Sequence, residues 1–296
     1  MSKSKVYFTK DISSGGLMKI YKALGVELEG NVAVKISTGE MGGHYYLSPH
    51  LIEPLVSKLK GTIVENNTAY PGKRERASDH WQVIKAHGFS DIAPCDILDE
   101  DGEMPLEVKD SKHLKGVNYV GDRLKKYESM LVLSHFKGHM MGGFGGALKN
   151  LSIGVASRSG KAWIHSWGNT KNPKDCWTFA ENQNAFLESM AEACEGVINY
   201  FTPSRLAYIN VANNISIDCD CDSNPHAPEM ADIGIFASLD PVALDRACVD
   251  AVFNSKDEGK ASLIKRIKER NGEHILTTAH KLGLGSLEYE IVDIDK

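Results

Sequence analysis

Two cysteines lie within an acidic segment, Asp218-Cys219-Asp220-Cys221-Asp222, and His226 follows five residues after the second of them. Two thiolates and an imidazole are ligands that zinc, iron and iron–sulfur clusters accept. We therefore predict Cys219, Cys221 and His226 as metal ligands, with a histidine from an earlier segment as an alternative third ligand. Two other interpretations stay open. The aspartates and Glu229 would suit a hard cation, and the cysteines would also suit a buried structural role.

A second group of reactive side chains follows a short apolar run at 130–133. His135, Lys137 and His139 come first, then four glycines within five residues, and then Lys149. Imidazoles carry protons near neutral pH, and a lysine can neutralise a bound anion. The sequence therefore predicts His135, His139 and Lys149 as catalytic residues.

The glycine-rich loop itself predicts an anion site. Glycine lets the backbone approach a ligand closely, and the start of a helix offers unpaired N–H groups to a negative charge. The loop matches neither the phosphate loop G-x-x-x-x-G-K-[ST] nor a dinucleotide motif, and a plain structural turn is the alternative. The residues predicted to bind a substrate anion are Lys35, Asn67, Tyr70, Gly142, Gly143, Gly145, Gly146, Arg158 and Lys161.

Alternating strands and helices must position these side chains. Apolar runs predict strands at 5–8, 32–37, 62–65, 130–133, 206–217, 233–237 and 289–294. Helical patterns cover 17–24, 49–59, 73–86, 181–201, 241–253, 260–270 and 274–282. Strand, loop and helix repeat three times before residue 90, which is typical of a parallel sheet. The carboxyl ends of such strands gather on one rim, so we expect the candidate residues to meet there.

The predicted fold is therefore α/β, with a mostly parallel central sheet flanked by helices, and two related lobes as an open alternative. The range 92–126 breaks the rhythm, and we expect a small antiparallel excursion or sub-lobe there. Residues 1–296 are predicted to form a single unit. If 218–222 extends the strand before it, Cys219 and Cys221 share one face.

Composition narrows the class of protein. The chain has 296 residues, of which 42% are hydrophobic and 25% charged, and its net charge is −5. This composition is typical of a globular protein, and the negative charge argues against nucleic acid as a partner. The sequence contains neither an apolar run long enough to span a membrane nor an apolar signal-peptide core, so we expect a cytoplasmic location. A C-x-x-C motif is also missing, which excludes a self-contained ferredoxin motif or zinc ribbon.

Five segments together resemble one family, that of domain of unknown function 362: VAVKISTGEMGGHYYLSP, ENNTAYPGKRERASDHW, SHFKGHMMGGFGGALKNLSIGVASRSGK, DCDC and MADIGIFASLDPVALDRA. Many relatives carry a two-cluster ferredoxin insert shortly after the position of 157–161. This chain has only Cys176 between 162 and 181, so the resemblance implies a member without the insert. The motif positions that it carries over are Lys35, Glu40, Asn67, Tyr70, His80, His135, Lys137, His139, Lys149, Asn150, Cys219 and Cys221.

Three functions are compatible with these observations. The first is a metal- or iron–sulfur-linked, redox-related protein, in which the cysteines hold iron, zinc or a cluster beside the anion-binding loop. The second is a metal-free enzyme or binding protein for a small phosphorylated or carboxylated metabolite. The third is a partner module for a separate ferredoxin, which would replace the insert of the relatives.

Overall fold

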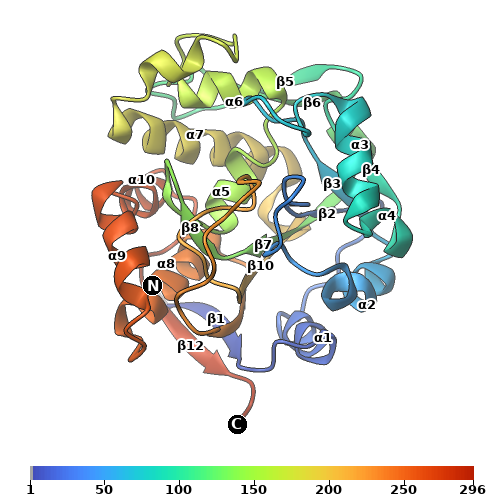
Figure 1. Cartoon of the computed structure of the whole chain (residues 1–296), viewed down its shortest axis with the longest axis vertical. Coiled ribbons are helices and arrows are strands. Elements are labelled where there is room, and N and C mark those ends of the chain that lie inside the picture. The colour runs from blue at the N-terminus through green and yellow to red at the C-terminus, as the bar shows by residue number, and fades with distance from the viewer. Residues whose placement is uncertain (1–2) are drawn as a thin grey trace.

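The structure is a computed structural model that describes residues 3–296. An eight-stranded sheet forms its centre, in the order β12-β1-β11-β10-β7-β2-β3-β4 (Figure 1). Neighbouring strands pair in parallel, except that β11 runs antiparallel to both β1 and β10. The eight strands are β1 (Ser4–Thr9), β2 (Val32–Lys35), β3 (Thr62–Glu65), β4 (Cys95–Ile97), β7 (Ser129–His135), β10 (Leu206–Ala212), β11 (Gly234–Ser238) and β12 (Tyr289–Asp293). The predicted mostly parallel α/β fold is thus confirmed.

Helices cover both faces of this sheet. The first layer consists of α1 (Ser14–Ala23), α2 (Pro49–Leu59), α3 (Ala77–Ala86) and α4 (Phe89–Ile92). The second layer consists of α5 (Ala147–Ser152), α6 (Arg158–His165), α7 (Gln183–Phe201), α8 (Pro241–Asn254), α9 (Lys260–Glu269) and α10 (His274–Lys281). Short 3-10 helices lie at Asp122–Lys126 (η1), Cys176–Phe179 (η2) and Pro203–Arg205 (η3).

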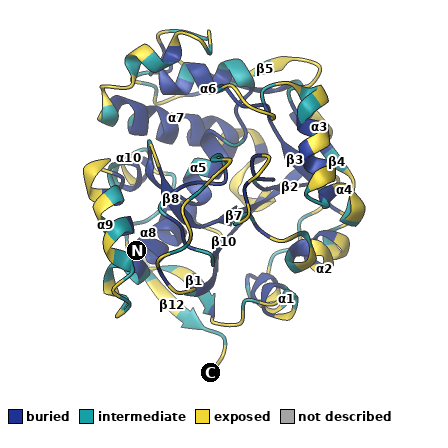
Figure 2. Ribbon diagram, in the orientation of Figure 1, coloured by how far each residue is buried: buried dark blue, intermediate teal, exposed yellow. Residues whose placement is uncertain are grey.

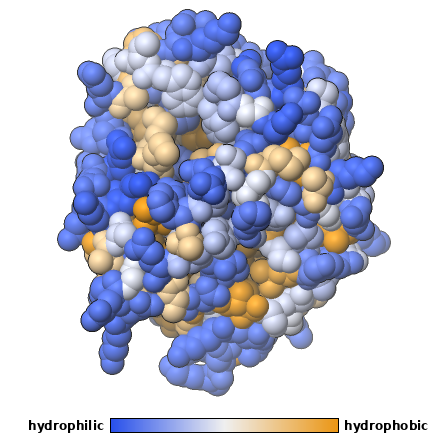
Figure 3. All heavy atoms as spheres, in the orientation of Figure 1, coloured by the Kyte–Doolittle hydropathy of each residue, from blue (hydrophilic) through white to orange (hydrophobic). Residues whose placement is uncertain are grey.

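Strand β7 shows how the sequence produces these two layers. All seven of its residues are buried, because it pairs with β10 on one side and β2 on the other. Successive side chains of a strand point to opposite faces. Met130 and Val132 accordingly pack in the core of the second layer, and Leu131 and Leu133 in the core of the first. Figure 2 shows the buried sheet between helices that expose one side, and in Figure 3 the visible surface is mainly hydrophilic.

The predicted excursion at 92–126 contains a two-stranded antiparallel sheet of β5 (Glu103–Glu107) and β6 (Val117–Gly121). The first part of that range belongs to the main sheet instead, because β4 pairs in parallel with β3 and forms the edge strand of that sheet. A third sheet, of β8 (Lys137–His139) and β9 (Gly143–Gly145), follows β7 directly.

The strand after α7 is shorter than predicted. Strand β10 ends at Ala212, whereas the apolar pattern extends to 217. Asn214 has a positive φ of 44°, which an extended strand does not allow. Its backbone N–H donates to the Asp232 carboxylate at 2.7 Å instead of to a strand neighbour. Residues 213–222 therefore form a loop, so the strand predicted at 206–217 is too long at its end, and the case in which 218–222 extends it does not apply.

Candidate functional site

A cavity of about 520 Å³ lies where β2 and β3 end and the loop after β10 passes. This is the edge at which open α/β sheets bind ligands, and the volume is in the range of small-molecule sites. Side chains from seven segments reach it. They include Glu40 after β2, Asn66, Tyr70 and Arg74 after β3, His139 of β8, Lys149 of α5, Lys161 and His165 of α6, Trp177 of η2, and Cys219 and Cys221.

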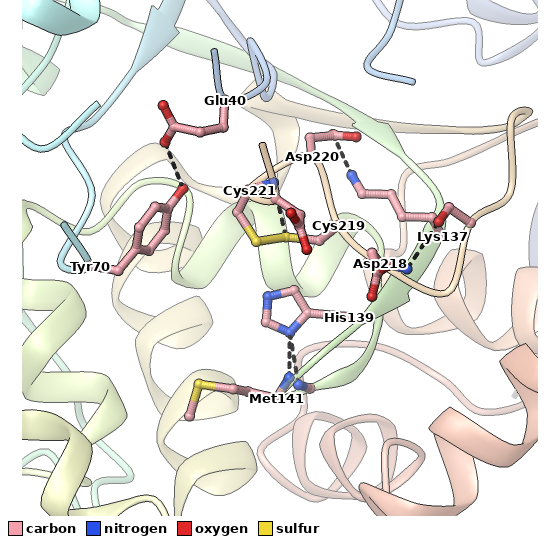
Figure 4. The surroundings of a disulfide bond; sticks show 12 residues. Glu40, Tyr70, Lys137, His139, Met141, Asp218, Cys219, Asp220 and Cys221 are labelled. Atoms are coloured by element: carbon pink, nitrogen blue, oxygen red, sulfur yellow. Dashed lines mark hydrogen bonds and ion pairs between the residues drawn. A yellow bond between two sulfur atoms is a disulfide. The ribbon is translucent and has the colours of Figure 1, made fainter. Parts of the chain in front are cut away.

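Cys219 and Cys221 form a tight turn at the cavity wall. Their sulfurs are joined as a disulfide, and their Cα atoms are 5.1 Å apart. The backbone N–H of Asp222 donates to the carbonyl of Cys219 at 2.9 Å, which closes the turn. Figure 4 shows the sulfurs between Glu40 and Tyr70 on one side and His139 on the other.

Asp220, between the two cysteines, anchors this turn to β7 and β8. Its carboxylate lies 2.8 Å from His135 Nδ1 and 2.5 Å from Lys137 Nζ, and all three side chains are buried. Burial alone would raise the pKa of Asp220, but Lys137 and His135 hold it well below its usual range. His135 Nε2 faces the carbonyl of Asn213 at 2.6 Å, so both of its nitrogens face oxygen acceptors.

A close backbone contact between β8 and the loop of residues 213–222 also holds the cysteine turn in place. The N–H of Gly138 donates to the carbonyl of Ser216 at 2.8 Å. A Cβ at Gly138 would overlap the carbonyl group of Ile217, so only glycine lets β8 approach the loop this closely. The cysteine turn is thus fixed by one buried ion-pair cluster and one close backbone contact.

His139 is 7% exposed and faces the two sulfurs with one ring nitrogen (Figure 4). Its Nδ1 accepts hydrogen bonds from the N–H groups of Gly142 at 2.8 Å and Met141 at 3.3 Å. Burial, together with nearby Lys149, lowers the pKa of His139 well below its ordinary value, so the ring is neutral. With Nδ1 as acceptor, the single proton of the neutral ring is on Nε2. The ring therefore offers an N–H donor to the sulfurs.

A ring nitrogen of His139 and the two sulfurs lie within 4.8 Å of one another, so these three residues could hold a metal ion once the disulfide is reduced. The set fits a single soft ion with an open position, since zinc sites with two cysteines and one histidine are of this kind. A ligating histidine usually donates its second N–H to an acceptor, whereas Nδ1 of His139 accepts. Within residues 3–296 the group has only two cysteines, too few for the four that an iron–sulfur cluster usually takes.

His226, predicted as the third ligand, does not join this group. Its Nδ1 lies 2.7 Å from the Asp218 carboxylate, and its side chain is 74% exposed. The hard-cation alternative also fails to assemble, because the acidic groups have separate partners. Asp218 faces His226, Asp220 faces Lys137, and Glu229 accepts from Ser262.

The opposite wall of the cavity carries a buried ionic network. The Glu65 carboxylate lies 2.9 Å from Lys35 Nζ and 3.1 Å from Arg74 Nη1, and Arg74 Nε is 3.5 Å from Glu40. Arg74 also donates to the Tyr70 hydroxyl at 2.8 Å. Burial opposes ionisation of Glu65, yet Lys35 and Arg74 hold its pKa well below normal. The charges of Lys35 and Arg74 are thus already neutralised by the protein.

Lys149 and Lys161 differ from those cations. Among residues 3–296, no carboxylate lies within ion-pair distance of either ammonium group. Lys161 is 7% exposed, and its Nζ donates only to the carbonyl of Ala156. Burial lowers the pKa of each lysine to about 7. Burial, together with Lys149 and Lys161, lowers the pKa of His165 to about 3, and all three residues line the cavity.

The start of α5, where the glycine-rich loop was predicted to bind a substrate anion, is occupied by the protein itself. The Asp245 carboxylate accepts from the N–H groups of Ala147 at 2.7 Å and Leu148 at 2.9 Å. It also accepts from Asn210. A Cβ at Gly146 would overlap this carboxylate. The glycine is therefore needed for internal capping, and the helix start has no free N–H pair at these positions.

The structure brings about half of the predicted site residues to the cavity. These are Lys35, Tyr70, His139, Lys149, Lys161, Cys219 and Cys221. The others lie outside its lining: His135, Asn67, Gly142, Gly143, Gly145, Gly146, Arg158 and His226. The side-chain oxygen of Asn67 forms a hydrogen bond with His80 Nδ1, and its side-chain nitrogen donates to the Asp99 carboxylate. Arg158 forms an ion pair with Glu75.

Sequence reasoning missed several side chains of this region as site residues, chiefly Glu65, His165 and Asp245. Glu65 had a usable signal, because it is a charged residue at the end of a short, otherwise apolar strand. His165 stacks on Phe186, 4.7 Å away between ring centroids, and its Nδ1 is buried without a hydrogen-bond partner. No pattern in the sequence distinguishes it from other helical histidines.

Comparisons with known proteins give a family and two similar folds. The sequence model of the family described as "Domain of unknown function (DUF362)" matches residues 32–250. Among curated proteins, none matches the chain. The lactate racemase apoprotein from Thermoanaerobacterium thermosaccharolyticum is 12% identical with a TM-score of 0.46, covering 84% of this chain and 57% of its own. A protein from Thermotoga maritima gives the same identity and TM-score, with 80% and 57% covered. The chain thus spans little more than half the length of either protein.

Within residues 3–296, we find no helix with both the length and the apolar character that a membrane crossing requires.

Proposed function

The chain belongs to the DUF362 family, and from that premise we propose that it is a redox-linked protein in which the Cys219–Cys221 pair reacts with a small anionic metabolite. One observation carries the proposal. The bonded sulfurs line the same cavity as Lys149 and Lys161, and no carboxylate within residues 3–296 lies within ion-pair distance of either lysine. A reactive pair and an anion-binding wall therefore share one space.

The chemistry of the pair follows from its surroundings. A disulfide that takes up two electrons and two protons becomes two thiols, and the thiolate is the reactive form. The Nε2–H group of His139 would donate a hydrogen bond to that thiolate, and Lys149 would stabilise its charge. In the cytoplasm, which we propose as the location, protein disulfides are usually transient and catalytic. The electrons would come from the metabolite or, one at a time, from a ferredoxin partner.

Redox titration of the purified protein tests this proposal. The protein is equilibrated in glutathione buffers of graded potential, its thiols are trapped with an alkylating reagent under denaturing conditions, and peptides are mapped by mass spectrometry. We expect Cys219 and Cys221 to be modified together in one two-electron transition, with the other four cysteines reactive throughout. Cys219→Ser should abolish the transition, and Cys95→Ser, a change outside the cavity, should leave it intact. A pair that stays reduced at every potential would exclude the proposal.

A second candidate function is the binding of one zinc or iron ion by the reduced pair and His139. The spacing of the three ligand atoms favours it. In this case the turn at 140–142 has to reorganise, because the Nδ1 atom of the ligating ring would then carry the proton. Elemental analysis of protein purified without oxygen tests this candidate. About one metal ion per chain, lost in Cys219→Ser and retained in Cys95→Ser, would support it. Metal-free protein with two titrating thiols would favour the redox pair.

A further inference from the structure

The cations around the cavity, all buried except the half-buried Lys149, fall into two classes. Lys35, Arg74 and Lys137 each lie within 3.1 Å of a buried carboxylate oxygen. Lys149 and Lys161 have no such partner within residues 3–296, although both line the cavity. Removing a charge from water is costly unless an opposite charge or hydrogen bonds compensate it. The charged forms of these two lysines thus need a counter-ion, and no carboxylate within residues 3–296 lies within ion-pair distance to supply it.

We infer that Lys149 and Lys161 together bind the dianionic group of a small organic molecule, either a phosphate monoester or a pair of carboxylates. A single carboxylate would neutralise only one of the two ammonium groups. The same cavity is also lined by the apolar side chains of Ile153, Met141 and Trp177. These side chains fit an uncharged body attached to the dianion. The inference rests on the proposed function only in placing the other end of that molecule at the sulfurs.

The electrostatic surroundings support a bound dianion at neutral pH. Each lysine has a pKa of about 7, mainly because of burial, so an incoming dianion would draw a proton onto both. Of the carboxylates that act on the two lysines, Asp220 and Glu65 already pair with cations, and Asp99 raises the pKa of Lys161 from beyond ion-pair distance. The full set includes further charged and titratable groups. Around Lys149 these are Lys137, Asp220, Lys35, Arg74, His139 and His165, and around Lys161 they are Asp99, Lys35, Glu65, Arg74, His80 and His165.

Calorimetric titration of the full chain with phenyl phosphate, phthalate and benzoate tests the inference. Phenyl phosphate and phthalate are dianionic, and benzoate has the same apolar ring with a single charge. We expect at least one of the two dianions to bind, and benzoate to bind about tenfold more weakly or worse, because it leaves one lysine unpaired. Tighter binding of phenyl phosphate would identify a phosphate ester, and tighter binding of phthalate a dicarboxylate.

Three lysine variants locate the site. Lys149→Met and Lys161→Met should each weaken binding of the preferred dianion about tenfold or more, because each removes a charge-assisted hydrogen bond. Lys85→Met removes the same charge from an exposed position on α3 and should change affinity less than about threefold, because exposed charges are screened. Repeating the titration of unmodified protein in buffers of different ionisation enthalpy should show proton uptake that both cavity variants reduce. Thermal unfolding of each variant confirms that it is folded.

Three results would overturn the inference: binding unchanged in both cavity variants, benzoate binding as tightly as the dianions, or no binding of any of the three probes. The double variant Cys219→Ser/Cys221→Ser separates this test from that of the proposed function. It should keep the dianion affinity, because the lysines do not depend on the sulfurs. If the redox titration fails while dianion binding passes, the redox assignment falls and the binding site stands.

Discussion

Lys137 Nζ lies 2.5 Å from the carboxylate of Asp220, and both side chains are buried. Lys137 belongs to the segment after the central strand, and Asp220 lies between the two cysteines 83 residues later. This ion pair is the main link between the two segments that sequence reasoning singled out. It places the sulfurs next to His139 rather than next to His226.

Asp220→Asn should therefore destabilise the protein strongly. Removing one partner of a buried ion pair leaves an unpaired charge and typically costs about 3–5 kcal/mol. Because the folded-state pKa of Asp220 is depressed, its contribution is present above the unfolded pKa of about 4 and is lost as the pH falls below it. Urea unfolding at pH 7 and pH 3 measures both effects, with Asp222→Asn as the matched control. Equal stability of the two variants at pH 7 would contradict the anchoring role.

Gly138→Ala should destabilise the loop of residues 213–222, which carries Cys219 and Cys221. The added methyl group would overlap the Ile217 carbonyl, and overpacking of this kind typically costs about 1–3 kcal/mol. Gly15→Ala, in α1, has room for the methyl group and should be neutral or stabilising. Hydrogen exchange of residues 214–222 provides the local readout. Faster exchange there in Gly138→Ala alone is expected, and unchanged exchange would mean that the close approach is not needed.

Asp245 should make stability fall as the pH rises from about 4 to 6. Burial raises its pKa to about 6, so the folded state binds this proton more tightly than the unfolded state does. Its favourable contribution is present below the unfolded pKa and is lost as the pH passes the folded value. The difference corresponds to about 2–3 kcal/mol. Asp245→Asn, which keeps an oxygen acceptor for only one of the two N–H groups, should remove this pH dependence, and parallel pH profiles of both proteins would refute the assignment.

The fold was largely predictable because its signals are local. Strand β3 and helix α2 have the predicted bounds, since one is a short apolar run and the other begins with a proline after Ser48. The end of β10 was not predictable. Its apolar pattern continues to Ile217, and the turn at Asn214 depends on Asp232, which lies 18 residues further on.

The site was predictable only in its residue types. Lysines and cysteines with reactive potential were identified, but their partners come from distant segments. The Asp245 carboxylate accepts from Leu148 at a helix start 97 residues earlier in the sequence. His139, which belongs to the segment predicted as the alternative source of the third ligand, lies beside the sulfurs in place of His226. Such pairings are set by tertiary structure, and neither periodicity nor spacing encodes them.

The central claim is that the cysteine pair shares one cavity with Lys149 and Lys161, and the reduction potential of the pair tests it most directly. Reduction would create a thiolate that competes with a bound dianion for Lys149, so the dianion should favour the disulfide. By linkage, saturating amounts of the preferred dianion should make the potential more negative by about 30 mV for each tenfold difference in affinity. Lys149→Met should reduce this shift. A potential that the dianion leaves unchanged, or makes more positive, would contradict the account.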